Sequence, residues 1–320
     1  MISMLILTDS DLERLVSMRD AIEAVEEAFG KLAQGVVQMP ERTIMAVGNG
    51  YILQMPCYIE GLSIATTKIV STYPENPRRG LPTTPAWIVV NDAETGMVEA
   101  IFEATYLTAL RTGAVTAVAA RYLAPKESRV AAVIGCGFQG RFQAWALTEV
   151  FRLQTLWAYD ISRERRRRFV EEMGERLDVE ILEAESAAQA VEEADIIVTA
   201  TTSKEPVIRR SWIGEEVHIS AIGSFQPDHR ELDTETVKEA KLVVDSREAA
   251  LREAGDILIP MREGVITEDH IYAELGELVL GLKPGRVKGD GLTVFKSVGL
   301  AIQDAAVASL ALKRWREHLE

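Results

Sequence analysis

The chain has 320 residues and a mass of 35.3 kDa, a length that corresponds to about two domains. Hydrophobic residues make up 47% and charged residues 26% of the sequence, which excludes a largely disordered chain and provides for a full core without disulfide or metal support. The 35 Lys and Arg residues against 49 Asp and Glu residues give a net charge of −14, which disfavours nucleic acid or an anionic membrane as the main partner. A local group of basic residues can still bind a small anionic substrate.

The cysteines and the amino-terminal residues narrow the class further. Cys57 and Cys136 are too few for a disulfide framework, and no Cys/His group has zinc spacing, so we expect no metal site. Residues 1–15 lack the basic and long apolar segments of a signal peptide, and no window approaches the roughly 20 apolar residues of a membrane span. We therefore expect a cytoplasmic protein.

The first third of the chain predicts a mixture of helix and strand. Thr8-Asp9-Ser10 precedes apolar residues at helical spacing, which predicts one or two capped helices ending at Gly35. Strand-like runs separated by turn residues follow at 42–47, 51–59, 62–71 and 86–92. Their close spacing predicts an antiparallel or mixed sheet, followed by a helix over about 105–123.

From Ser128 onward, short apolar runs alternate with helix-like segments. The runs lie at 129–135, 153–160, 179–182, 194–202, 216–223 and 240–245. This alternation predicts a doubly wound parallel sheet with helices on both faces. Residues 292–320 predict a short strand and a long helix that returns to the first domain. We therefore expect a discontinuous domain, 1–124 plus 293–320, around a cofactor-binding domain, 125–292.

A glycine-rich turn is the strongest local motif. Residues 135–140 read Gly-Cys-Gly-Phe-Gln-Gly, directly after a predicted strand and at the start of a predicted helix, which is the context of a dinucleotide-binding turn. The first glycine permits the tight turn, the second admits a pyrophosphate, and the third lets helix and strand pack closely. The phosphate then lies at the positive end of the helix dipole. The motif predicts cofactor contacts from Gly135, Gly137, Phe138, Gln139 and Gly140.

An acidic residue follows at the spacing that a dinucleotide-binding domain requires. Asp160 ends the second predicted strand of this domain, where a carboxylate accepts the ribose hydroxyls of NAD and repels the 2′-phosphate of NADP. Ser162, Arg163 and the arginines after them offer contacts for such a phosphate, although a solvated helix face is the favoured interpretation of the run 163–168. The sequence favours NAD and leaves NADP possible.

Three basic residues lie in otherwise apolar segments of the first domain. Lys68 lies within a strand-like run, Arg111 in a helix of small apolar residues, and Arg42 just before another apolar run. A lone buried cation is costly unless it meets a counter-charge or lines a cavity. Each can be a structural ion pair, but together they favour an anion-binding pocket.

These motifs and several others together resemble the ornithine cyclodeaminase/μ-crystallin family, with most similarity to its ketimine reductases and archaeal-type alanine dehydrogenases. The resemblance implies a Rossmann domain inserted into a discontinuous α+β substrate-binding and dimerisation domain, a homodimer, and a small 2-amino, 2-keto or 2-imino acid bound beside the nicotinamide. By motif position, Arg42, Lys68 and Arg111 match residues that hold the substrate carboxylate and polarise the reacting centre. Thr112 matches a residue near the cofactor phosphate. The segments that carry the resemblance are 39–42, 67–84, 104–114, 133–140, 220–233, 242–257, 273–281 and 298–308.

The chain departs from the family pattern after the fifth strand of the second domain. Cyclodeaminases and alanine dehydrogenases of the family carry an Asp two residues after the Ile-Gly pair, whereas this chain has Phe225. Phe can neither handle the ornithine side-chain amine nor assist proton transfer, which disfavours ornithine cyclisation and weakens the case for alanine dehydrogenase activity. Asp228 has two open interpretations: a catalytic or orienting residue, or an ordinary turn residue after Pro227.

The sequence thus predicts an NAD(P)-dependent oxidoreductase that reversibly reduces a small 2-imino acid to an L-amino acid. The substrate would be a cyclic ketimine such as pyrroline-2-carboxylate, or the imine of pyruvate. Lys68 and Asp228 are the candidate catalytic residues, and Arg42, Lys68 and Arg111 the candidate substrate-binding residues. One alternative is an ornithine cyclodeaminase-type ammonia lyase with recycled NAD, and another is a non-catalytic binding protein.

Overall fold

The computed structural model describes residues 4–318, whose contacts divide the chain into two compact units. One unit comprises the residues up to Arg111 together with those from Leu300 onward, and the other comprises Thr112–Gly299. The helix α3 (Thr105–Leu123) is continuous across the first of these limits. The domain limits 1–124 plus 293–320 and 125–292 therefore stay a prediction.

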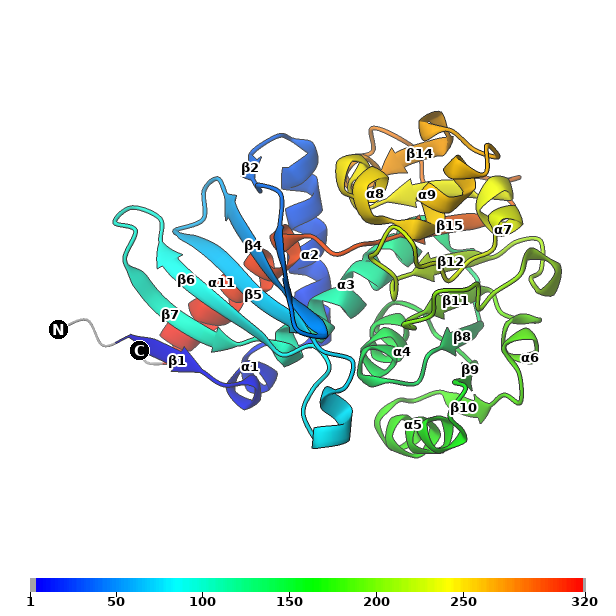
Figure 1. Ribbon diagram of the computed structural model, residues 1–320, viewed down its shortest axis with the longest axis horizontal. Coiled ribbons are helices and arrows are strands. Elements are labelled where there is room, and N and C mark those ends of the chain that lie inside the picture. Colours follow the sequence, from blue (N-terminus) through cyan, green and yellow to red (C-terminus); the bar gives the residue numbers. More distant parts are fainter. Residues whose placement is uncertain (1–3, 319–320) are drawn as a thin grey trace. The chain divides into compact units, whose positions relative to one another are not determined.

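The first unit is built on a mixed sheet of seven strands among the described residues (Figure 1). Its order is β1-β7-β6-β5-β4-β2, with β3 also paired to β4; β1 runs parallel to β7 and every other pair is antiparallel. This confirms the mixed sheet that the close strand spacing predicts. The short 3-10 helix η1 covers Asn76–Arg79, and the strands are β1 (Leu5–Leu7), β2 (Val37–Gln38), β3 (Thr43–Val47), β4 (Gly50–Ile59), β5 (Ile64–Thr72), β6 (Ala86–Asp92) and β7 (Val98–Glu103).

Besides the start of α3, this unit has three helices among the described residues: α1 (Asp9–Leu15), α2 (Met18–Ala33) and α11 (Ala301–Glu317). Thr8 and Ser17 each cap their helix in a capping box, which satisfies amide groups that the first turn leaves free. The carboxy-terminal helix α11 packs against β4, β5 and α2. Because α11 packs on β5, it places its own polar residues beside those of β5.

The second unit is built on an eight-stranded sheet in which every pair is parallel. Its order is β10-β9-β8-β11-β12-β15-β13-β14, so the sequence order reverses between β8 and β11 (Figure 1). This confirms the predicted α/β doubly wound fold. The strands are β8 (Val130–Ile134), β9 (Thr155–Tyr159), β10 (Glu180–Glu183), β11 (Ile196–Thr199), β12 (His218–Ala221), β13 (Lys241–Val244), β14 (Ile271–Glu274) and β15 (Thr293–Lys296).

The helices of this unit alternate with its strands over most of the chain. Because a parallel strand pair needs a crossover, this alternation follows from the sheet itself. The strand β15 pairs with β12 and β13, so it lies in this sheet, whereas α11 just after it lies in the first unit. The helices are α4 (Phe138–Val150), α5 (Arg163–Arg176), α6 (Ala187–Val191), α7 (Thr234–Glu239), α8 (Arg247–Glu253), α9 (Gly255–Arg262) and α10 (Leu275–Val279), with 3-10 turns η2 (Arg210–Trp212) and η3 (Glu268–His270).

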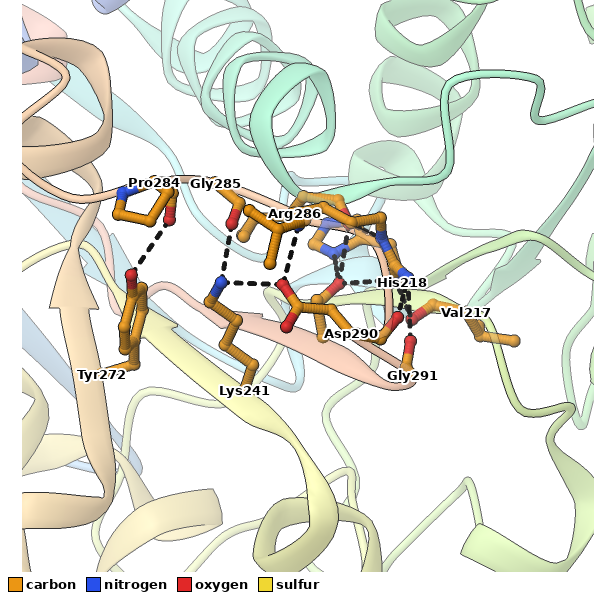
Figure 2. Close-up of polar contacts among 12 residues, drawn as sticks. Val217, His218, Lys241, Tyr272, Pro284, Gly285, Arg286, Asp290 and Gly291 are labelled. Atoms are coloured by element: carbon orange, nitrogen blue, oxygen red, sulfur yellow. Dashed lines mark hydrogen bonds and ion pairs between the residues drawn. The ribbon is translucent and has the colours of Figure 1, made fainter.

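A polar cluster fastens the amino-terminal edge of the parallel sheet (Figure 2). The guanidinium of Arg286 donates to the carbonyl oxygens of Leu123, Val217 and Gly291, and thereby joins the end of α3 to the starts of β12 and β15. The His218 ring lies between two hydroxyl groups, and burial lowers its pKa to about 3, so the ring is neutral at neutral pH. This edge is structural, and the opposite, carboxyl edge carries the glycine-rich turn.

Within residues 4–318, no helix combines the length and the apolar character needed to cross a membrane.

Candidate active site

The glycine-rich turn connects β8 directly to α4, at the reversal point of the parallel sheet. Gly135 has φ +106°, a conformation that other residues rarely adopt, and a Cβ there would lie 2.6 Å from the carbonyl oxygen of Ala200. A Cβ on Gly140 would lie 2.0 Å from the carbonyl oxygen of Gly135, because helix and turn touch at that point. Both positions therefore require glycine.

Gly137 differs because its surroundings are open. It is the N-cap of α4, no side chain caps the helix there, and a Cβ would meet nothing within 4 Å. The positive end of this 13-residue helix thus faces open space at Gly137, where an anion can approach. Phe138 and Gln139 form the first turn of α4, and Phe138 is 52% exposed.

Asp160 lies just after β9 and contacts the glycine-rich turn. One carboxylate oxygen accepts the Cys136 amide at 3.0 Å and the other accepts the Ser162 amide at 2.9 Å. Each oxygen retains a further lone pair for a ligand hydroxyl. The carboxylate is thus held beside the turn, where it can bind the ribose of a dinucleotide.

The arginine run after Asp160 contains both exposed and buried side chains. Ser162 caps α5 through its hydroxyl oxygen, and Arg166 is buried in an ion pair with Glu183 at 3.0 Å. Arg163, by contrast, is exposed to solvent. These observations agree with a dinucleotide site: a turn between strand and helix that requires glycine, an uncapped helix start with open space beside it, and a carboxylate next to the turn.

A second cluster lies inside the first unit, where β5, α3 and α11 meet. The ammonium of Lys68 is 2.7 Å from Oδ2 of Asp304, and Nε of Arg111 donates to Oδ1 of the same carboxylate at 3.0 Å. A terminal nitrogen of Arg111 also donates to the side-chain oxygen of Gln303. Lys68 and Asp304 are each 1% exposed and Arg111 is 6% exposed. One buried carboxylate therefore holds two buried cations.

The charge balance of this cluster tunes Lys68. Burial, together with the charges of Arg111 and Arg42 and against the opposing charge of Asp304, lowers the pKa of Lys68 to about 7. Arg42 is therefore close enough to act on Lys68, so the structure brings all three predicted basic residues together. The neighbouring thiol of Cys57 is neutral, because burial raises its pKa to about 12.

Thr112, Asp228 and Phe225 belong to the second unit. Thr112 is 8% exposed in the interior of α3. The side chain of Asp228 is 72% exposed and bonds to Nδ1 of His229 at 2.9 Å, in the loop after β12; Phe225 in the same loop is half-buried. The catalytic role of Asp228 stays a prediction, as do the roles of the other predicted site residues.

Sequence reasoning missed Gln303 and Asp304. Both lie in a helix of small apolar residues, so the signal that singles out Lys68, a lone polar residue in an apolar segment, was present. It also missed Lys296, which is 1% exposed and pairs with Asp256 at 2.8 Å in the second unit. Among residues 4–318, no group of His, Cys, Asp or Glu side chains is arranged to hold a metal ion.

Comparison with known proteins places the chain among enzymes. The family model "Ornithine cyclodeaminase/mu-crystallin family" matches residues 3–318. The chain belongs to this family. A solved structure of Thermococcus litoralis Δ1-pyrroline-2-carboxylate reductase, in complex with NADH and L-proline, is 50% identical, with a TM-score of 0.96 and 98% of each chain covered. The resemblance read from the sequence motifs is thereby confirmed.

Two further family members are similar over nearly the whole chain. An archaeal alanine dehydrogenase dimer with bound NAD is 40% identical, with a TM-score of 0.93, covering 99% of this chain and 97% of that one. The ketimine reductase mu-crystallin of Rattus norvegicus is 36% identical over 296 residues, 92% of this chain and 90% of the relative. These relatives share an oxidoreductase chemistry at imines and amino acids.

Proposed function

We propose that the chain is an NAD(P)-dependent oxidoreductase that reversibly reduces a small 2-imino acid to an L-amino acid. The observation that carries this proposal is the buried Lys68–Asp304–Arg111 cluster, in a chain whose other unit holds a glycine-rich dinucleotide turn. The relative at 50% identity, a pyrroline-2-carboxylate reductase in complex with NADH and L-proline, supports this class of substrate.

The buried cations provide for the acid group of the substrate. Arg111 donates hydrogen bonds through Nε and one terminal nitrogen, and its second terminal nitrogen has no hydrogen bond to the described residues. Among the described residues, the Lys68 ammonium forms an ion pair with Asp304, and an ammonium has three N–H donors. Buried donors are costly when they remain unpaired, and a carboxylate accepts them in charge-assisted bonds. We assign carboxylate binding to Arg111, Lys68 and Arg42.

Lys68 also provides the proton. When bound, a reduced nicotinamide supplies the hydride for the imine carbon, and the imine nitrogen needs a proton in the same reaction. With its pKa near 7, Lys68 gives up a proton readily at neutral pH, as a general acid should. In the oxidative direction the neutral amine of Lys68 accepts the proton. The residues of this chain thus bind, orient and protonate.

The cofactor is assigned to the second unit. Gly135, Gly137 and Gly140 form the turn around the pyrophosphate, the amides of α4 meet its charge, and Asp160 accepts the ribose hydroxyls. A carboxylate at that place repels a 2′-phosphate, so we propose NAD as the preferred cofactor; Ser162 and Arg163 leave NADP possible.

A second copy of the chain is the partner we propose, because Ile69 and Trp87 form an exposed apolar pair on the first sheet. Lys68 faces α11, so the next residue on β5, Ile69, faces the opposite side. Ile69 is 37% exposed and pairs directly with Trp87, which is 43% exposed. The archaeal alanine dehydrogenase relative is a dimer, which supports a homodimer. A cytoplasmic location stays a prediction.

The test is a set of turnover assays on the purified protein. Oxidation of NADH and of NADPH is followed with Δ1-pyrroline-2-carboxylate, Δ1-piperideine-2-carboxylate, and pyruvate plus ammonia. We expect turnover on at least one cyclic imine, faster with NADH. Turnover on pyruvate and ammonia alone would make the protein an alanine dehydrogenase, and ammonia release from L-ornithine without net cofactor oxidation would replace the proposal by the lyase.

A further inference from the structure

We propose that Asp304 is a positioning residue of the site, which holds Lys68 as the group that carries the proton and Arg111 as the group that binds the substrate carboxylate. This inference rests on the function proposed above. The observation behind it is that the Asp304 carboxylate on α11 contacts Lys68 with one oxygen and Arg111 with the other.

Two residues of α11 hold Arg111 in one orientation. Its Nε donates to Asp304 and one terminal nitrogen donates to Gln303, so two adjacent residues of α11 fix the plane of the guanidinium. Since a guanidinium is rigid and planar, two such bonds determine where the remaining terminal nitrogen points. That nitrogen has no hydrogen bond to the described residues and is left to a ligand.

Asp304 also lies between the two cations. Lys68 and Arg111 are both nearly excluded from water, and without a counter-charge they would repel each other at short range. Asp304 lies between them, with 2.7 Å from Oδ2 to the Lys68 ammonium and 3.0 Å from Oδ1 to Nε of Arg111. Each carboxylate oxygen faces one of the two cations, so Asp304 holds both of them in place.

Asp304 further affects whether Lys68 holds its proton. The charged groups facing Lys68 are Arg111 from α3, Arg42 from the segment before β3 and Asp304 from α11, while the Cys57 thiol from β4 is neutral. Of these, Asp304 alone favours the ammonium. Removal of its charge leaves burial and two arginines, all of which favour the neutral amine.

Reduction of the imine adds one hydride to carbon and one proton to nitrogen. The carbon–nitrogen double bond of the imine is reduced: the carbon receives hydride from a reduced nicotinamide, which is oxidised, and the nitrogen lone pair takes a proton from the Lys68 ammonium. Lys68 is left as a neutral amine that still bonds to Asp304. The amine regains its proton from solvent before the next turnover.

The test compares Asp304→Asn with Asp304→Glu and with a matched control, Asp20→Asn. Asp20 also pairs with an arginine of α11, Arg314 at 2.6 Å, but lies outside the site. The primary readout is independent of activity: in protein labelled with ¹³C at lysine Cε, the NMR resonance that Lys68→Met removes is titrated. We expect a midpoint near pH 7 in the wild type and in Asp20→Asn, and a midpoint lower by about one pH unit or more in Asp304→Asn.

The second readout is the pH profile of imine reduction. In Asp304→Asn we expect kcat to fall about 100-fold and the fall in activity at high pH to begin at lower pH. Asp304→Glu keeps the charge, so we expect its Lys68 midpoint to stay near that of the wild type while KM rises. An unchanged Lys68 midpoint in Asp304→Asn, or an equal shift in Asp20→Asn, would overturn the inference. If Asp304→Asn does not fold, a shifted Lys68 midpoint in Asp304→Glu would overturn it instead. Absence of wild-type turnover on every imine would overturn the proposed function instead, and the titration would still decide the role of Asp304.

Discussion

Gly137→Ala separates cofactor binding from folding more cleanly than any other change in the glycine-rich turn. A Cβ at this position meets nothing within 4 Å, and the backbone has φ −76°, which alanine adopts freely. The fold should therefore be unaffected. The added methyl group occupies the open space in which a pyrophosphate would approach the first amides of α4. Loss of one hydrogen bond to a charged group costs about 1.5–3 kcal/mol, which raises the Kd for NADH about 10- to 100-fold.

Two other glycines serve as controls for this prediction. Gly140→Ala places a Cβ 2.0 Å from the carbonyl oxygen of Gly135, so we expect a loss of about 1–3 kcal/mol in the free energy of unfolding as well as weaker NADH binding. Gly174→Ala lies within α5 with nothing near its Cβ and should stabilise the protein by about 0.5–1 kcal/mol without any effect on NADH. Binding is measured by calorimetry and unfolding by denaturant titration. An NADH Kd for Gly137→Ala within twofold of the wild type would refute the assignment of this turn to the pyrophosphate.

Three further predictions test other parts of the molecule. Lys68→Met should lower kcat for imine reduction about 10²- to 10⁴-fold, while the Kd for NADH, measured by calorimetry, stays unchanged; retention of most activity would exclude Lys68 as the proton donor. Burial lowers the pKa of His218 to about 3. As pH falls from about 6.5 towards 3, the unfolded chain therefore binds a proton that the folded chain does not, and the free energy of unfolding falls by about 1.4 kcal/mol per pH unit. His218→Gln should make the pH dependence of the free energy of unfolding shallower in that range and leave it unchanged above it. Trp87→Glu should convert a homodimer to monomers in sedimentation velocity, and a dimer that persists at equal concentration would show that another surface forms the interface.

Local patterns in the sequence predict local structure well in this chain. The capped helix start at Thr8, the four predicted strands that match β3, β4, β5 and β6, and the turn at 135–140 all depend on interactions between near neighbours, and the structure has each of them. The doubly wound sheet follows from the alternation of apolar strands and helices. The family resemblance adds the class of reaction, which no single motif specifies.

The arrangement of the buried cations could not be predicted from their positions in the sequence. Arg111 and Asp304 are 193 residues apart and meet only because α11 returns to pack on β5. Their contact is a product of tertiary packing, for which a single sequence holds no spacing rule. For the same reason the sheet that β15 joins could not be predicted. The short run Thr293–Lys296 indicates a strand but not its neighbours, and we expected it in the domain of the helix that follows, whereas it lies between β12 and β13.

Net transfer of hydride to the α-carbon of an imino acid is the central claim, and one labelling measurement tests it most directly. The purified protein is incubated with Δ1-pyrroline-2-carboxylate and NADH that carries deuterium at the transferable position, and the products are analysed by mass spectrometry. We predict L-proline with one deuterium at the α-carbon and one equivalent of NAD formed for each equivalent of product. Product without deuterium, or turnover without net loss of NADH, would contradict the reductase mechanism.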